Sequence, residues 1–378
     1  MKKKLERSVS FCKIVIQQTE RLSRCCICKI FCCPELGKGN GLNNYKGSGT
    51  MKKTVLALAV PALLATGATQ AVELYNDGSA TFSVGGRLNL MILNSDSSTV
   101  LTNNSSRINF NFSKTITDSV TARSTLEYGL GNPQNNNVDE DTGISTSFFN
   151  RLAFIAFDHD SAGSISFGKQ WSTYYEVAGA TDVFWVNGGT AMGIYGGGDE
   201  RGTARADESV KYDNSIGNFN LSAQYQFENE SNNRDSSYAL AASYDFDFGL
   251  NIGAAYHVAD YTAAGQKDSK QLALAATYAT DAWYASVAYA DLKDLYDRKS
   301  NGYEGVVAYT FPNAVQLYAG FNYLDYDAAS TRDTQYIVGA AYYIAGVRFY
   351  GEYANVEEKT GGSKADDDLF AVGVRYYF

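Results

Sequence analysis

Apolar and polar side chains alternate with a period of two residues along most of the chain after residue 72. In the stretch 219–227, FNLSAQYQF, the odd positions are apolar or small and the even positions carry Asn, Ser or Gln. This alternation is typical of β-strands with one apolar and one polar face. It predicts sixteen strands, at 80–94, 104–114, 120–130, 148–159, 163–171, 209–214, 219–228, 237–246, 249–259, 270–279, 282–291, 302–311, 315–325, 334–344, 346–355 and 368–378.

The connections between these strands alternate in length. Short ones such as TDS at 117–119 and PNA at 312–314 alternate with long polar ones at 132–146 and 355–368. Most strands have about the length of roughly 9–11 residues that a tilted strand needs to cross a bilayer. The pattern predicts an all-β fold, a transmembrane 16-stranded antiparallel up-and-down β-barrel with tight turns on one side and long loops on the other.

A soluble β-sandwich or solenoid is the alternative, and the small residues on one strand face argue against it. Ala, Gly and Ser would fill a protein core poorly, whereas a closed barrel satisfies every backbone group and leaves no strand edge. The last segment, AVGVRYYF at 371–378, is aromatic. We expect it to be the final strand, paired with the first, with its aromatic end at the membrane interface.

The stretch 51–71, MKKTVLALAVPALLATGATQA, has the three-part plan of a secretory signal peptide. Two Lys follow Met51, an apolar run follows them, and small residues precede a cleavage site after Ala71. A buried amphipathic helix is the alternative. We expect residues 1–50, which hold all six Cys, to be leader sequence translated upstream of Met51, and residues 72–378 to form the mature barrel domain.

Charge differs between these parts. Residues 72–378 hold 20 Lys and Arg against 38 Asp and Glu, a net charge of −18. So acidic a domain should repel nucleic acid. Much of the negative charge lies in the long connections, for example Asp139–Asp141 and Asp366–Asp368. If these form the mouth of a channel, a mild preference for cations follows.

Several stretches resemble the general, or diffusion, porins of Gram-negative bacteria, and are most like porin-like outer-membrane proteins of marine gammaproteobacteria. They are SRINFNFSKTI at 106–116, FNRLAFIAF at 149–157 and GSISFGKQWSTYYEVAGATDVFWVNGG at 163–189. The resemblance implies a homotrimer in the bacterial outer membrane, with the third loop folded into each pore. Its partners would be membrane lipid and lipopolysaccharide, small polar solutes and ions, and the barrel-assembly machinery, which would read Phe378 as its signal.

The resemblance also implies a constriction with a basic wall and an acidic loop. The basic positions are Arg87, Arg107, Arg151, Arg205 and Lys169, and strand phase adds Arg123 as a candidate. On the loop, Asp182 matches a family acid, and the candidates to compensate for a second acid are Glu176, Asp199, Glu200, Asp207 and Glu208. Val186 stands where the family carries a second acid, which puts the usual acidic pair in doubt. Strand phase independently places Arg87 and Arg107 on the polar faces of their strands.

Other candidate chemistry is weak. GIYGGGDERG at 193–202 has no strand–loop–helix context for a phosphate cradle, and we expect a constriction loop there. His159 and His257 are expected to be solvated, and we expect no cofactor, metal or enzymatic activity. The sequence predicts a water-filled channel for small hydrophilic solutes and ions. Two alternatives stay open. One is a substrate-selective channel, which the third-loop aromatic residues Tyr174, Tyr175, Trp185 and Tyr195 would favour if they line the lumen. The other is a structural or adhesion role.

Overall fold

The computed structural model describes residues 71–131, 148–263, 265–295, 298–327 and 331–378. The leader and all of the signal peptide except Ala71 lie outside the described residues. The described strands are β1 (Val72–Asn76), β2 (Ala80–Asn94), β3 (Thr99–Asn103), β4 (Arg107–Thr117), β5 (Val120–Leu130), β6 (Phe148–His159), β7 (Gly163–Trp171), β8 (Arg205–Ala206), β9 (Ser209–Ile216), β10 (Phe219–Gln226), β11 (Arg234–Asp245), β12 (Leu250–Tyr261), β13 (Ser269–Ala279), β14 (Trp283–Leu295), β15 (Arg298–Thr310), β16 (Val315–Tyr326), β17 (Arg332–Ile344), β18 (Val347–Thr360) and β19 (Ser363–Tyr377).

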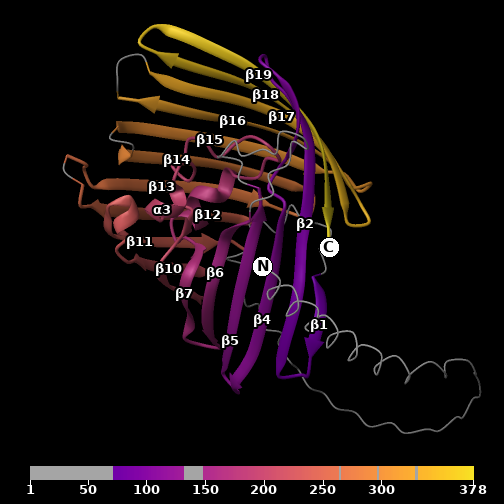
Figure 1. Ribbon diagram of the computed structural model, residues 1–378, viewed down its shortest axis with the longest axis vertical. Coiled ribbons are helices and arrows are strands. Elements are labelled where there is room, and N and C mark those ends of the chain that lie inside the picture. The colour runs from indigo at the N-terminus through magenta and orange to yellow at the C-terminus, as the bar shows by residue number, and fades with distance from the viewer. Residues whose placement is uncertain (1–70, 132–147, 264, 296–297, 328–330) are drawn as a thin grey trace, which may run out of the picture. The chain divides into compact units, whose positions relative to one another are not determined.

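Sixteen of these strands pair antiparallel with their neighbours and close into a ring (Figure 1). The ring runs from β2 to β4, through β5, β6 and β7 to β9, and onward in chain order to β19, which pairs with β2. The predicted barrel and its antiparallel topology are confirmed. Closure joins the last predicted strand to the first, from Phe370 opposite Asn94 to Tyr377 opposite Arg87.

Both ends of the described chain share one edge of β2. The far half of β2 pairs with β19, and its near half pairs with β1, where Val72 lies opposite Val84. Between them, the Gly86 N–H donates to the Phe378 carbonyl at 2.9 Å, and the Phe378 N–H donates to the Gly86 carbonyl at 3.1 Å. Two strand ends therefore cover one edge, which leaves few unpaired backbone groups at the seam.

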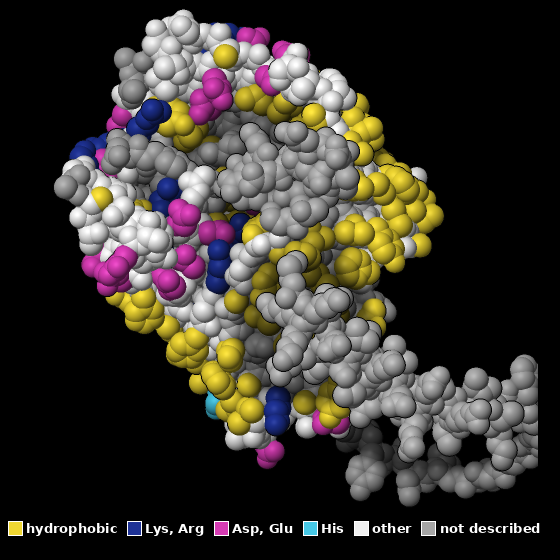
Figure 2. Space-filling model, in the orientation of Figure 1, with side chains coloured by type: hydrophobic (Ala, Val, Ile, Leu, Met, Phe, Trp, Pro, Cys, Tyr) yellow, Lys and Arg dark blue, Asp and Glu magenta, His cyan; other side chains and the backbone are white. Residues whose placement is uncertain are grey.

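Alternation puts apolar side chains outside the ring and polar ones inside, the reverse of a soluble protein. On β10, Leu221 and Tyr225 are exposed, while Ser222, Gln224 and Gln226 between them are buried. Figure 2 shows hydrophobic side chains gathered in broad patches on the surface of the strands. A polar inner face and an apolar outer face are what a barrel in a bilayer requires.

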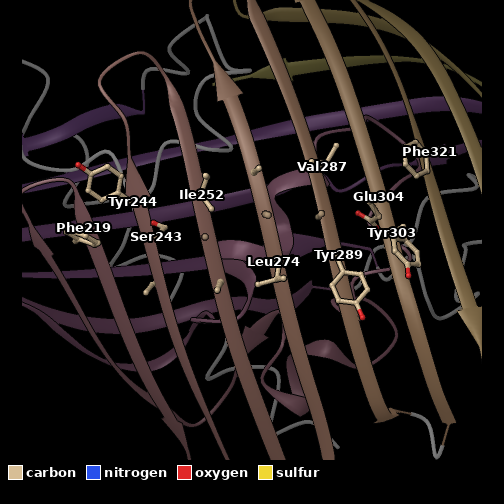
Figure 3. A pocket seen from close by; sticks show the side chains of 16 residues that line it. Phe219, Ser243, Tyr244, Ile252, Leu274, Val287, Tyr289, Tyr303, Glu304 and Phe321 are labelled. Carbon is tan, nitrogen blue, oxygen red and sulfur yellow. The ribbon is translucent and has the colours of Figure 1, made fainter.

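The outer wall is shallowly hollowed between β10 and β16. Small residues such as Ala242, Ala254 and Ala276 form the floor of this groove, and larger apolar side chains stand around it. The larger ones include Phe219, Tyr244, Ile252, Leu274, Val287 and Phe321 (Figure 3). Lipid-facing positions need only be apolar, so the wall tolerates this irregular relief.

The strand prediction is wrong in three details. The predicted strand 104–114 is observed at Arg107–Thr117, because residues 99–103 turn back as β3 against the far end of β2. β3 and β4 run in the same direction along β2, and Ser105, with a φ of 62°, lies in the break between them. The short strands β1 and β8 were not predicted either, because two to five residues are too few to show an alternation of apolar and polar side chains.

The predicted long polar loop at 355–368 is also wrong. β18 and β19 continue through it as a paired hairpin, which turns at Gly361 and Gly362. Both glycines have positive φ, 56° and 93°, which a tight turn requires and other residues adopt at a cost. These strand ends read as a loop because both of their faces are polar.

Four short helices interrupt the described residues: α2 (Tyr175–Ala178), η2 (Gly179–Thr181), α3 (Gly198–Arg201) and η3 (Glu230–Asn232). None of them is long or apolar enough to span a bilayer. Three lie in residues 172–204, the segment between β7 and β8, which we call loop 3.

Candidate functional site

Loop 3 packs against the inner wall of the ring. Its side chains Tyr174, Val177, Met192 and Ile194 form a buried cluster with small wall residues, among them Ala239, Ala255 and Ala273. The wall residues come from β11, β12 and β13, which lie three to five strands from β7 around the ring. Alanines on the inner wall leave the room that the loop's larger side chains fill.

Two buried wall carboxylates hold the loop from the side of β15 and β18. Glu352 on β18 is 1% exposed and accepts hydrogen bonds from the backbone N–H groups of Trp185 at 2.8 Å and Asn187 at 2.7 Å. The Asn187 side chain and the Tyr318 hydroxyl donate to it as well, each at 2.8 Å. A carboxylate with this many donors is a strong anchor, because hydrogen bonds to an ionised acceptor are stronger than neutral ones.

Glu304 on β15, also 1% exposed, holds the loop at a second point. The Ala191 N–H donates to it at 2.7 Å, and the Thr181 hydroxyl donates to its other oxygen. We missed Glu304 and Glu352 in the sequence. The signal was present: each is the lone acid of its predicted strand, 302–311 or 346–355, and is flanked by Gly and Tyr. An ionisable residue in a membrane strand is a functional candidate by default.

The predicted basic residues lie on consecutive strands, and five of the six come together. Arg87 on β2 is directly opposite Arg107 on β4. Glu127 on β5 pairs with Arg107 at 3.3 Å and with Arg151 at 2.7 Å. Farther round, Asp199 of loop 3 pairs with Lys169 at 3.3 Å and with Arg205 at 3.0 Å.

Arg123 lies apart from this group. It pairs with Asp158 at 2.7 Å, and its guanidinium lies 5.5 Å from the centre of the Phe154 ring. It shares β5 with Glu127 but stands four residues nearer the turn to β4.

Two further arginines continue the row on the other side of Arg87, and the sequence reasoning missed them. Arg348 on β18 is directly opposite Arg375 on β19, and the next inward position of β19, Tyr377, is opposite Arg87. We call Arg348, Arg375, Arg87, Arg107, Arg151, Lys169 and Arg205 the basic belt. Their ring strands run from β18 through β19, β2, β4 and β6 to β7, with β5 between β4 and β6, and β8 pairs with β7, so the belt follows one side of the inner wall.

The four predicted loop acids have different surroundings. Asp199 belongs to the basic side, as described. Asp182 accepts hydrogen bonds from the Tyr175 hydroxyl at 2.6 Å and the Tyr195 hydroxyl at 2.8 Å. Burial raises the pKa of Asp182 above its usual value, although these hydrogen bonds and the nearby Arg151 and Arg205 act in the opposite direction.

Glu176 and Glu200 do not meet the basic belt. The Glu176 carboxylate contacts the Lys211 ammonium on β9, and Lys211 also pairs with Asp213 at 3.2 Å. The side chain of Glu200 is exposed, and its carbonyl accepts a hydrogen bond from Arg234. Val186, which replaces the expected acid, contributes only its backbone N–H to Glu352, at 3.3 Å.

The two histidines differ. His159 is exposed, as expected, and accepts a hydrogen bond from the Ser161 N–H at 3.1 Å. The expectation of solvation is wrong for His257, which is fully buried under Tyr174, with its Nδ1 2.6 Å from the Gln271 Oε1. Loop 3 covers this part of the wall, which strand phase alone could not reveal.

The family model of the Gram-negative porins matches residues 55–361. The chain belongs to the Gram-negative porin family. Outer membrane porin N of Escherichia coli is 31% identical over 65% of this chain and 67% of that protein. Porin-like protein L of Photobacterium profundum is 28% identical over 87% of this chain and all of its own length.

Solved structures agree on the fold. OmpF of Salmonella typhi superposes with a TM-score of 0.67 at 20% identity, over 81% of this chain and all of that one. OmpT of Vibrio cholerae, solved in a trimer form, gives 0.63 at 21% identity, over 79% of this chain and all of that one. The protein is thus an outer-membrane porin, a barrel channel for the passive diffusion of small hydrophilic solutes.

Proposed function

We propose that the porin is a homotrimeric, weakly selective diffusion channel whose narrowest part lies between the basic belt and loop 3. The observation that carries this is the fixed position of loop 3 on the inner wall, held by Glu304 and Glu352. A loop fixed inside a polar barrel narrows the water-filled space without closing it. The trimer form of the Vibrio cholerae structure supports the homotrimer.

At the constriction, Arg87, Arg107, Arg151, Lys169 and Arg205 form the basic side. The ion pairs support this grouping, since Glu127 joins Arg107 to Arg151 and Asp199 joins Lys169 to Arg205. Arg87 lies directly opposite Arg107. Asp182 is the loop acid that we place on the opposing side, because the remaining loop acids already have other partners or point away. Arg123, Glu176 and Glu200 stay predictions for the same constriction, outside the two ion-paired groups.

Selectivity follows from the balance between the mouth and the constriction. The net charge of −18 over residues 72–378, much of it in loops, concentrates cations at the mouth. The basic belt opposes this deeper in. Salt screens exposed charges within about 10 Å at 0.1 M, so the preference for cations should be mild and should fade as salt rises.

Planar-bilayer recordings of the purified protein test this proposal. We expect open channels in steps of three and a small cation-favouring reversal potential across a KCl gradient at low salt. An anion-favouring sign would refute the cation preference but not the channel. Closed bilayers with correctly folded protein would refute the channel itself.

A substrate-selective channel is the second candidate, because aromatic rings lie at the base of loop 3. The Trp171 and Tyr175 rings stack with centroids 4.2 Å apart, and the Arg205 guanidinium lies 5.8 Å from the centre of Trp171. Stacked rings beside a cation resemble a sugar-binding surface. Interruption of the ion current by millimolar sugars would favour this candidate, and an unchanged current would favour plain diffusion.

Assembly partners complete the proposal. The exposed apolar outer wall should contact lipid and lipopolysaccharide, and the strand that ends at Phe378 should be read by the barrel-assembly machinery. Phe378→Ala should then lower the amount of barrel in the outer membrane more than it lowers the stability of folded barrel. We also propose that the protein has no enzymatic activity.

A further inference from the structure

Four arginines stand side by side on four neighbouring strands. Arg348 is opposite Arg375, and Arg87 is opposite Arg107. Arg375 is paired with Asn89, two residues from Arg87 on β2, so Arg375 and Arg87 point to the same face. Residues opposite each other in a sheet have Cβ atoms about 4.5–5.5 Å apart, and diagonal neighbours about 7–8 Å. The four guanidiniums therefore crowd one part of the inner wall.

Carboxylates neutralise the positive charge of some of these four arginines but not of others. Arg107 shares Glu127 with Arg151. Arg87 and Arg375 take part in none of the ion pairs among the described residues. The Arg87 Nε donates to the Ser105 carbonyl at 3.0 Å, and the Arg375 side chain reaches only the Tyr377 hydroxyl, at 3.5 Å. Neutral oxygens satisfy single donors but do not offset the positive charge.

Arg375 gives the strongest indication of a binding site among these residues. The residue is 5% exposed, and its Nε is buried with no hydrogen-bond partner among the residues that the structure describes. A buried N–H of a charged group without an acceptor is costly, and native structures rarely leave one empty. Arg87 is only partly buried and is a diagonal neighbour of Arg375 across β2 and β19, so the two guanidiniums can serve one acceptor.

Trp185 braces the cluster from loop 3. Its ring centre lies 4.7 Å from the guanidinium carbon of Arg375 and 4.3 Å from that of Arg348. A guanidinium held against an aromatic face gains a cation–π interaction and keeps its in-plane N–H groups free for other acceptors. The loop that narrows the channel therefore also orients these donors.

We propose that Arg87 and Arg375, braced by Trp185, form a binding site for the oxyanion groups, phosphate or carboxylate, of multiply charged solutes in the channel. The proposal rests on the channel function given above and adds a solute class to it. Guanidiniums bind both groups through paired N–H donors, which chloride cannot use in the same way. Binding must stay weak, because a solute that passes must also leave.

The test is ion-current block in single channels of the full protein at 0.1 M KCl. Tripolyphosphate and citrate are added separately at millimolar concentrations, as the phosphate and the carboxylate probe. We expect both to interrupt the current, and the Arg87→Gln/Arg375→Gln double variant to need at least tenfold more of each. Block by only one probe would assign the site to that group alone.

Two further variants keep the test decisive. Lys270→Gln removes an exposed positive charge on β13, outside the belt, and should leave the block unchanged. Arg87→Gln alone serves if the double variant fails to insert, with an expected weakening of at least threefold. Open channels that neither probe blocks, or a block that these arginine variants leave unchanged, would overturn the site. A protein without channels would instead overturn the proposed function.

Discussion

The wall carboxylates and the wall arginines lie on the same inner surface but differ in what neutralises them. Glu352 accepts hydrogen bonds from three backbone N–H groups, an amide and a hydroxyl. Arg375 and Arg87, one and two strands away, have only neutral partners among the described residues. Buried acids whose donors are all internal serve the structure. Buried cations whose charge is not offset remain available to a solute.

The comparison also shows why a count of charges misjudges a pore. The domain is strongly acidic, yet the acids deepest in the barrel are enclosed by loop 3 or paired with the basic belt. The field that a passing solute meets there is therefore more positive than the sequence suggests. The acids that remain exposed stand mostly at the outer ends of the strands.

Loss of the Glu352 anchor should give the largest effect. Glu352→Ala leaves the N–H groups of Trp185 and Asn187 without their acceptor, at a cost of roughly 1–3 kcal/mol for each buried group. We expect loop 3 to leave the wall, the single-channel conductance to rise, and proteases to cut the loop. Glu358→Gln, on the same strand but exposed, is the control. A conductance equal to that of the unmodified protein would show that Glu352 does not hold the loop.

A cation introduced on the outer face of the wall tests whether that face, unlike the inner one, excludes charge. Val287 is exposed on the outer side near the middle of β14. Val287→Arg should destabilise the barrel by about 2–4 kcal/mol, the cost of Arg at the bilayer midplane. Urea titration of the protein in lipid vesicles measures this, with Val287→Leu as the control. Equal midpoints for the two variants would mean that this face does not contact lipid.

Sequence reasoning recovered the barrel because one physical constraint repeats in every strand. Leu221 and Tyr225 must face lipid, so their neighbours face inward, and the period of two follows. Where strands extend beyond the membrane, neither face has to contact lipid, and the alternation of apolar and polar residues ends. Residues 355–368 are polar on both faces and looked like a loop, although they form a hairpin.

The site was only partly accessible to the same reasoning. Family resemblance supplied Arg107, Arg151 and Arg205, which the structure brings together. It could not supply Glu352 or Arg375, whose roles depend on which wall loop 3 reaches. That contact joins residues more than 160 positions apart, Trp185 and Glu352, and no local pattern encodes it.

Trp185 links the two regions, and its replacement should have a moderate effect. Trp185→Leu keeps the backbone donors to Glu352 but removes the aromatic face from Arg348 and Arg375. A cation–π interaction is worth roughly 0.5–2 kcal/mol. We expect the polyanion block to weaken a few-fold while the KCl conductance changes little, and Trp185→Phe to lie between. A large rise in conductance would show instead that the indole itself holds the loop.

The smallest expected effect is a shift of selectivity with pH. Because burial raises the pKa of Asp182, this carboxylate takes up a proton at a higher pH than a solvated Asp does. Its folded pKa lies above its unfolded one, so protonation favours the folded state, and this contribution to stability grows as the pH falls through the folded pKa. Acidification also removes a negative charge that faces Arg151 and Arg205.

The reversal potential should therefore move toward anions by a few millivolts as the pH falls from neutral through the raised pKa of Asp182. Asp182→Asn should show the shifted value already at pH 7 and should lose the pH dependence over this range. If the variant and the unmodified protein titrate in parallel, Asp182 does not oppose the belt, and the acidic side of the constriction lies elsewhere on loop 3.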